Sequence, residues 1–278
     1  MPTASTAVEV TAPQAWFLAE HLHAGTFPWK LAITAPYVDP RERDQFNAGC
    51  VEELTGLGVL DEQGRVHPSV AESIRTVCQA RQWLEWVTVI DADRILRGVL
   101  ARTPASPAAV VALRYAQMVT FTPMQIDYSE SLVPVLTAGL DDQPPADFSE
   151  FTLPMDLGAA IDTRIAAGAD VAETLAAFDI PEREAQIMEL ARHGERSWVE
   201  ITAHEATATG SRHQTDVCVN LINSEVGRIL VHPADPDAPR AAGESVFAPA
   251  EPFAVAVALR DLTARLPTPW FSHENFDI

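Results

Sequence analysis

The chain has 278 residues, of which 47% are hydrophobic and 21% are charged. This composition provides enough apolar surface for a core, and it excludes a disordered chain, a collagen-like repeat and a disulfide scaffold. The formal net charge of −20 is spread over both halves of the sequence, and a field of that sign repels nucleic-acid phosphates and anionic lipid head groups. We therefore expect neither nucleic-acid binding nor a stable association with membranes.

Cysteine usage and the first residues bear on the cellular compartment. The three cysteines, Cys50, Cys78 and Cys218, form no CxxC pair, which indicates neither a disulfide framework nor a zinc ribbon. The first residues lack the basic start and apolar stretch of a signal peptide, and no window of 18 apolar residues occurs. We expect a cytoplasmic protein that needs no cofactor.

The first half of the chain begins with helical patterns and continues with strand patterns. In order, we expect a short extended start, three helices, three segments that form three or four strands, and a short helix, at 8–10, 15–22, 40–57, 68–80, 83–90, 94–102, 109–121 and 129–139. The strand segments are rich in β-branched and aromatic residues and are separated by short polar or proline-containing breaks, which is typical of antiparallel strands.

Residues 141–154 are rich in proline and acidic residues, which predicts a linker. Beyond it the order of patterns repeats, with helices, then strands, then a helix, at 156–167, 170–178, 181–193, 197–206, 212–222, 227–232 and 252–266. We therefore expect one domain made of two related halves, 1–140 and 155–278. Runs of strands beside runs of helices favour the α+β class, with either one joined antiparallel sheet or two facing sheets, and a helical bundle at each end.

The sequence contains no catalytic or metal-binding pattern. GxSxG is absent, and Gly56 and Gly58 lack the third glycine of a dinucleotide-binding loop. His204-Glu205 starts like a zinc-protease motif, but Ala208 stands where the second histidine is required. We therefore predict no catalytic residue, no metal site and no enzymatic activity.

The strands of the second half each present one polar face. With a period of two, one face of 212–222 carries Arg212, Gln214, Asp216, Cys218 and Asn220. Glu200 lies on the polar face of the neighbouring strand. Two interpretations stay open from these residues: an ordinary sheet with one solvated face, or a recognition surface made of strands and the loops between them.

Six segments, in order along nearly the whole chain, resemble the EspG family of secretion-associated chaperones of mycobacterial type VII (ESX) systems. They are PWKLAITAPY (28–37), VALRYAQMVTFTPMQI (111–126), LVPVLTAGL (132–140), SWVEITAHE (197–205), QTDVCVNLINSEVGRILVHP (214–233) and LRDLTARLPTPWF (259–271). The segments of the first half are most similar to the member that serves the third ESX system.

The resemblance implies a cytoplasmic, non-enzymatic protein with a central antiparallel sheet, two helical bundles and quasi-twofold symmetric halves. It also implies a partner, the PE–PPE heterodimer, bound through the apolar tip of PPE in a 1:1:1 complex that meets the ESX machinery transiently. Covering an exposed apolar helical tip prevents aggregation. A weak homodimer of the free chain is a further expectation. The alternative is a small-molecule-binding protein or enzyme whose pocket is lined by the sheet.

The binding surface of the family involves the sheet of the second half, the C-terminal helical part and the loop between the second and third strands. Matched onto this chain, Arg212 and Asp216 resemble contact positions, and Gln214 joins them on the same face. Arg102 and Ser106 belong to the short loop between the strands. Together with Glu200 these are the partner-binding residues that we expect.

Overall fold

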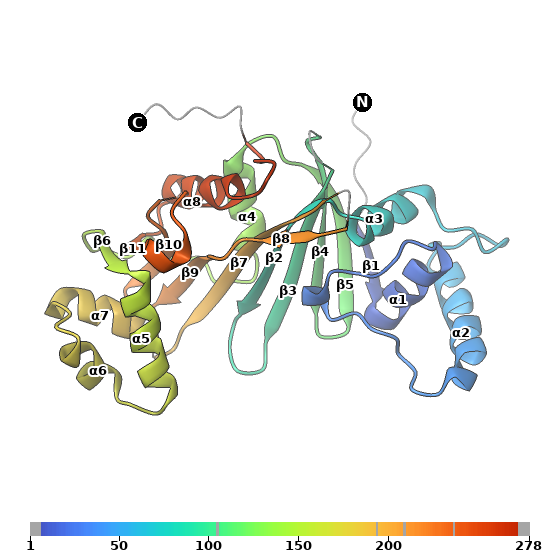
Figure 1. Cartoon of the computed structure of the whole chain (residues 1–278). Helices are drawn as coiled ribbons and strands as arrows, with labels where there is room; N and C mark the ends of the chain where they lie inside the picture. The colour runs from blue at the N-terminus through green and yellow to red at the C-terminus, as the bar shows by residue number, and fades with distance from the viewer. Residues whose placement is uncertain (1–6, 104–105, 193, 208–209, 236, 272–278) are drawn as a thin grey trace. The chain divides into compact units, whose positions relative to one another are not determined.

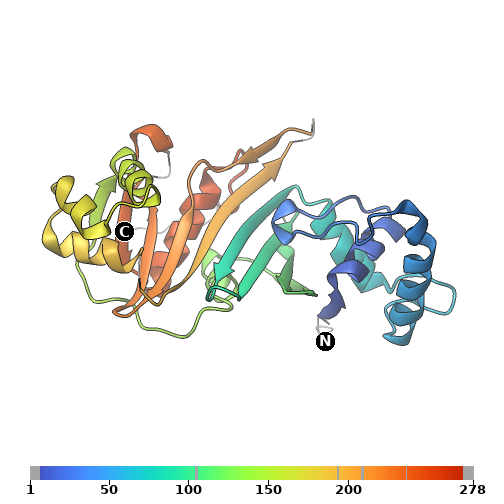
Figure 2. The same cartoon turned by 90° about the horizontal axis from the view of Figure 1, so that it is seen from below.

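The structure is a computed structural model that describes residues 7–103, 106–192, 194–207, 210–235 and 237–271 (Figures 1 and 2). The chain forms two compact units, each built from three stretches. Unit 1 consists of residues 1–87, 94–127 and 204–212, and unit 2 of residues 88–93, 128–203 and 213–278. Strands pair antiparallel in both units, and each unit has its own group of helices. The predicted α+β class with antiparallel sheet and two helical groups is therefore confirmed.

Unit 1 contains three helices and most of five strands. They are β1 (Val8–Thr11), α1 (Ala12–His21), α2 (Arg43–Gly56), α3 (Pro68–Cys78), β2 (Gln82–Val89, through Val87), β3 (Ile95–Arg102), β4 (Ala108–Tyr115) and β5 (Met118–Gln125), with two 3₁₀ turns, η1 (Trp29–Leu31) and η2 (Pro40–Glu42). The strand order includes β1-β5-β4-β3-β2. The last residues of β7, from His204, also belong to this unit.

Helices α1 and α3 pack on one face of the unit 1 sheet, and α2 packs against α1. The capping box that starts α1 explains the abrupt change from strand to helix: the Gln14 N–H donates to Thr11 Oγ1 at 3.3 Å, and the Thr11 N–H donates to Gln14 Oε1 at 2.9 Å. The covered face consists of small and aromatic residues, among them Val99, Ala112 and Phe121, all fully buried.

The segment 109–121, one of the three that were expected to form three or four strands, is a hairpin. β4 and β5 are joined by Ala116 and Gln117, and Ala116 has a left-handed backbone with a φ of 50°. Arg114 Nε donates to the Ala116 carbonyl at 2.9 Å and supports the turn. The position of this turn was not predicted, because it contains neither glycine nor asparagine, the residues that favour this conformation in hairpins.

The described residues of unit 2 form five helices and all or most of six strands. They are α4 (Val133–Leu136), β6 (Phe151–Pro154), α5 (Met155–Ala166), α6 (Val171–Ala177), α7 (Glu182–Leu190), β7 (Ser197–Ala206, through Ala203), β8 (Arg212–Gln214, from His213), β9 (Val219–Ser224), β10 (Gly227–Pro233), β11 (Glu244–Pro249) and α8 (Pro252–Ala264), with 3₁₀ turns η3 (Ser129–Leu132) and η4 (Arg240–Ala242). The strand order is β7-β9-β10-β11-β6, and β8 pairs with β7. In the described ranges, no helix is long and apolar enough to cross a membrane.

Two groups of helices contact the sheet of unit 2. Helices α5, α6 and α7 bury apolar side chains against residues of β9, β10 and β11, including Ile222, Ile229 and Phe247. Helix α8 contacts β9 and β10 and lies on the other side of these strands (Figures 1 and 2). The sheet of unit 2 is thus the middle layer, and its side toward α5 is the one that matters for the site described below.

The proline-rich segment 141–154 packs onto unit 2. The Asp141 carbonyl accepts hydrogen bonds from Asn223 Nδ2 at 2.8 Å and Arg228 Nη2 at 2.7 Å, and the Ala146 N–H donates to the Arg228 carbonyl at 2.9 Å. The segment ends in β6, which pairs with β11. These contacts do not test the predicted relation between the halves 1–140 and 155–278, which stays a prediction.

Candidate functional site

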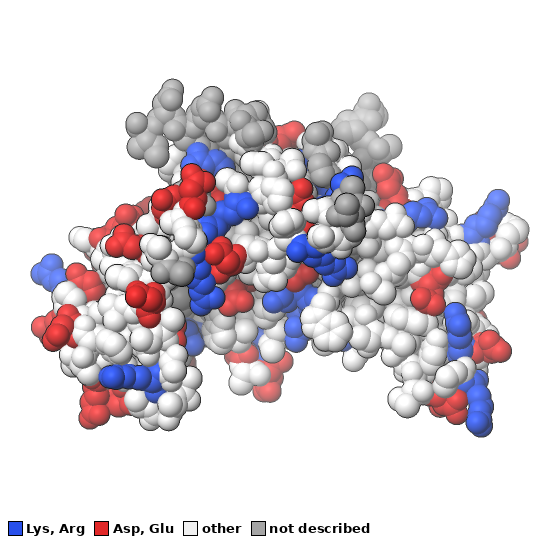
Figure 3. All heavy atoms as spheres, viewed as in Figure 1, with Lys and Arg blue, Asp and Glu red and all other residues white. Residues whose placement is uncertain are grey.

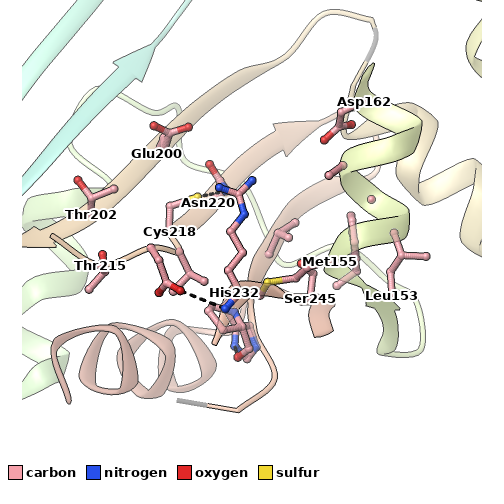
Figure 4. Close-up of a pocket in the computed structure, with 18 of the residues that line it drawn as sticks. Leu153, Met155, Asp162, Glu200, Thr202, Thr215, Cys218, Asn220, His232 and Ser245 are labelled. Carbon is pink, nitrogen blue, oxygen red and sulfur yellow. Dashed lines mark hydrogen bonds between the residues drawn. The ribbon is translucent and has the colours of Figure 1, made fainter. Parts of the chain in front are cut away.

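A groove of about 500 Å³ lies in unit 2, between the start of α5 and the strands that face it (Figure 4). Its residues come from four places: the β6–α5 segment, the end of α7, the sheet, and the loops that follow β8 and β10. Those labelled in Figure 4 are Leu153, Met155, Asp162, Glu200, Thr202, Thr215, Cys218, Asn220, His232 and Ser245.

The groove lies where one face of the unit 2 sheet changes from apolar to polar. Register partners on neighbouring strands form a row across this face, in the order Phe151, Phe247, Val231, Asn220 and Glu200. The two phenylalanine rings stack with their centroids 4.9 Å apart, inside the cluster that α5–α7 cover. Asn220 and Glu200, at the polar end of the row, offer little apolar surface for helices α5–α7 to bury. These two residues line the groove instead.

Two titratable groups of the groove are held in their neutral forms. Burial raises the pKa of the Cys218 thiol, and the hydrogen bond from Asn220 Nδ2, 3.2 Å from the sulfur, opposes this rise. Burial lowers the pKa of His232, whose Nδ1 donates to the Pro233 carbonyl at 2.9 Å. A neutral thiol is a weak nucleophile, so this arrangement favours packing and hydrogen bonding over covalent chemistry.

Asp216 is held by two donors at the edge of the groove. Its Oδ2 accepts the Arg240 backbone N–H at 3.0 Å, and its Oδ1 accepts Arg265 Nη2 at 3.1 Å. The Arg240 N–H is the largest cause that lowers the pKa of Asp216. Burial, the second-largest effect, opposes it, and the hydrogen bond and charge of Arg265 lower the pKa further. The carboxylate is therefore ionised and joins the bend after β8 to the loop after β10.

A family model described as the EspG family matches residues 11–261 of the chain. The chain belongs to the EspG family. It is 46% identical to the ESX-3 secretion-associated protein EspG3 of Mycolicibacterium smegmatis, over 95% of this chain and 89% of that protein. It is 42% identical to the protein of the same name from Mycobacterium tuberculosis, over 98% and 95% of the two chains. The predicted similarity to the member of the third ESX system is therefore confirmed.

A solved structure shows the same fold in another member of the family. The type VII secretion system chaperone EspG5 of Mycobacterium tuberculosis, solved in complex with a PE25–PPE41 dimer, matches with a TM-score of 0.77 at 18% identity. The match covers 95% of this chain and 98% of that one. At this level of identity the likeness concerns the fold, which is that of an EspG protein.

Three of the six predicted partner-binding residues of this EspG-family chain line the groove, namely Glu200, Gln214 and Asp216. They do not lie on a single strand face, because the predicted strand 212–222 is broken. β8 ends at Gln214, the chain bends at Asp216, and β9 starts at Val219. At the break, the Thr215 hydroxyl accepts the Ala203 N–H at 3.2 Å, so a side chain takes over part of the backbone pairing. The prediction of one continuous polar face is therefore wrong.

The other three predicted residues belong to unit 1. Arg102 is 6% exposed, and burial lowers its pKa. The Ser106 hydroxyl accepts the Ala108 N–H at 3.2 Å, which gives it a role in the turn before β4. Arg212 is exposed, and its guanidinium carbon lies 5.9 Å from the ring centroid of Trp83. Residues 104 and 105 of the same loop lie outside the described residues.

Sequence reasoning missed the groove residues that come from outside β7–β9. The apolar side is formed by Leu153 and Met155 with Val231 and Phe247, and the loop after β10 contributes Arg240. The alternation of 227–232 and the apolar residues just after the proline-rich segment contained a signal for the apolar side. Nothing in the local sequence indicates that Arg240 returns to the sheet.

Proposed function

We propose that this chain is a cytoplasmic chaperone that binds the apolar tip of the PPE subunit in a cognate PE–PPE heterodimer. It forms a 1:1:1 complex, keeps the heterodimer soluble, and directs it to the ESX secretion machinery of the third system, which it meets transiently. Two kinds of similarity support this: the ESX-3 relatives at 46% and 42% identity, and the fold of a chaperone solved with a PE–PPE dimer. Their names describe secretion-associated proteins and a chaperone, in agreement with the prediction of no enzymatic activity.

The observation that carries the proposal is the row that turns from apolar to polar inside one groove. The end of a helix presents apolar side chains together with backbone groups that have no partner within the helix. The apolar half of the groove, near Val231 and Phe247, suits the side chains, whereas amides and hydroxyls such as Asn220, Gln214 and Thr202 suit the backbone groups. A helical tip matches this mixture better than the uniformly apolar side of a helix.

The charge of the molecule fits a soluble carrier. On the face shown in Figure 3, acidic side chains are scattered among uncharged ones and form no single patch. A net charge of −20 opposes self-association and binding to nucleic acid or anionic membranes. A PE–PPE heterodimer bound to this acidic chain therefore stays in solution, without aggregating, until it is delivered.

The alternative of a small-molecule-binding protein or enzyme called for convergent groups with shifted pKa values in a cavity. The groove does contain three, Cys218, His232 and Asp216. Burial is the first cause of the shifts of Cys218 and His232, which stay neutral, whereas Asp216 is held ionised by the Arg240 N–H and Arg265. Hydrogen bonds to Asn220 and to the Pro233 carbonyl engage Cys218 and His232 further. These contacts favour the groove as a protein-binding surface.

Coexpression with candidate PE–PPE pairs tests the proposal, followed by size exclusion with light scattering to obtain the stoichiometry. We expect a 1:1:1 complex with a cognate pair, and Glu200→Arg in the groove should weaken it by at least tenfold because the new charge faces the docked partner. Glu225→Arg is the matched control, since Glu225 is exposed in unit 2 but does not line the groove.

If no PPE-containing pair copurifies with the wild-type chain, the proposed function fails. Equal binding by Glu200→Arg and wild type would instead move the binding surface away from the groove. The same light-scattering measurement on the free chain tests the predicted weak homodimer.

A further inference from the structure

The loop between β10 and β11 carries Arg240 and is fastened from two sides. Arg265, just after α8, has a side chain that is only 8% exposed. Its guanidinium donates to the Asp235 carbonyl at 3.1 Å, to the Ala238 carbonyl, and to Asp216 Oδ1 at 3.1 Å. One buried cation thus holds two carbonyls of the loop and the carboxylate at the edge of the groove.

Asp216, which is held by Arg265, in turn binds the backbone of Arg240. Its second oxygen accepts the Arg240 backbone N–H at 3.0 Å, at the first residue of η4. Both oxygens of Asp216 are therefore engaged within the chain. This favours a positioning role for Asp216 over the direct partner contact predicted from the sequence.

The side chain of Arg240 lies in the groove. It lines the cavity with Cys218 and Asn220, and its charge is close enough to act on the Cys218 thiol, as does the opposite charge of Glu200. The other groove cation, Arg192, is paired with Asp162 at 2.8 Å. Within the described part of the chain, no side chain forms a hydrogen bond or ion pair with the guanidinium of Arg240.

We propose that Arg240 is the cargo-binding cation of the groove, and that Asp216 and Arg265 are positioning residues that hold its backbone in place. This inference rests on the proposed function. The group that it would bind is the C-terminal end of a helix at the PPE tip, where up to four backbone carbonyls lack partners and the helix dipole is negative. A guanidinium offers five donors in a planar arrangement and stays charged when water is excluded.

The geometry also explains why a cation is tolerated beside apolar residues. Before cargo binds, Arg240 is exposed to solvent, so its charge is hydrated. After binding, the carbonyls of the helix end would replace that water with charge-assisted hydrogen bonds. The fixed backbone of Arg240 reduces the entropy lost when the side chain becomes ordered.

The first test compares Arg240→Gln with Arg183→Gln, an exposed arginine of α7 in the same unit but outside the groove. With a PE–PPE pair that binds the wild type, we expect Arg240→Gln to raise the Kd about tenfold, equivalent to about 1.4 kcal/mol, with an unchanged melting temperature. Arg183→Gln should leave the Kd unchanged. Equal Kd values for Arg240→Gln and wild type would overturn the role of Arg240.

The second test separates positioning from direct contact. Asp216→Ala should expose the Arg240 amide to rapid hydrogen exchange in the cargo-free protein, whereas Asp216→Asn, which keeps one acceptor oxygen, should restore part of the protection. As a single substitution, Asp216→Ala should also weaken cargo binding. When it is added to Arg240→Gln it should have little further effect, because the effects of residues that act through one another are not additive.

Unchanged amide protection in Asp216→Ala, or fully additive losses in the double variant, would overturn the positioning role. Hydrogen exchange needs no cargo, so it tests the loop even if no PE–PPE pair binds. A wild-type chain that binds no PE–PPE pair would refute the proposed function, and the contact assigned to Arg240 with it.

Discussion

The helix-covered sheet faces of the two units differ in how far their apolar character extends. In unit 1 a row of register partners runs through Val8, Phe121, Ala112 and Val99, and every member is apolar. In unit 2 the corresponding row begins with Phe151 and Phe247 and ends with Asn220 and Glu200. The helices follow this pattern: α1 and α3 pack against the strands of the apolar row, whereas along the unit 2 row the α5–α7 cluster stops at Val231 and the polar end lines a groove. The position at which an apolar row ends thus determines which part of a sheet face is left uncovered by the chain's own helices and can bind a partner.

The largest difference is expected from placing a charge in each row. Ala112→Asp introduces an unpaired carboxylate at a fully buried position of unit 1 and should lower the free energy of unfolding by about 3–5 kcal/mol. Asn220→Asp, at the polar end of the unit 2 row, should lower it by less than about 1 kcal/mol, since the groove admits water. Urea unfolding of both variants measures the contrast, and equal losses would contradict the difference between the rows.

A smaller loss is expected at the apolar end of the unit 2 row. Phe247→Ala removes a ring that is 4% exposed and stacks on Phe151, which should destabilise the chain by about 3 kcal/mol. Phe253, on α8, is 55% exposed, so Phe253→Ala serves as a control with a loss below about 1 kcal/mol. Calorimetric melting curves test the pair. If both variants melt at the same temperature, the stacked rings contribute nothing to the cluster under α5–α7.

The smallest effect concerns pH and involves a histidine of each unit whose pKa is lowered. Burial is the first cause that lowers the pKa of both His204 in unit 1 and His232 in unit 2, from an ordinary value of 6.5. Protonation then favours the unfolded state, so the stability is fully present above pH 6.5 and is lost as the pH falls through the lower folded values. Between pH 7.5 and 5, the urea concentration at the midpoint of unfolding should decrease less in His232→Gln than in the wild type. The decrease that is left in the variant comes from His204 and other groups. An identical pH profile in the variant would show that burial does not shift His232.

Several elements could be predicted because their signals are local. Strand β7 was predicted over its whole length, and α5 and α8 within two residues, since each has a regular apolar period. The break between β8 and β9 could not be predicted in this way. The polar residues at 212, 214, 216, 218 and 220 keep the period of a strand, while the bend depends on Thr215 bonding to Ala203 and on Asp216 bonding to Arg240 and Arg265.

The candidate site could be predicted only in part for the same reason. Glu200, Gln214 and Asp216 line the groove as polar residues of the second half. Arg102 was predicted as a partner-binding residue from its place beside a loop, yet its side chain is buried in unit 1. Residue type and loop position do not determine burial, because burial depends on what the rest of the chain places above the strand.

By itself, the sequence determined the α+β class, the antiparallel strands and membership of the EspG family, because these depend on periodicity and on residue patterns spread along the whole chain. Only the tertiary structure decided where the apolar row of unit 2 ends and that Arg240 enters the groove beside Cys218. Those features result from register between strands and from hydrogen bonds that join residues 24 and 49 positions apart. No local pattern encodes such long-range pairings, since each depends on the packing of the others.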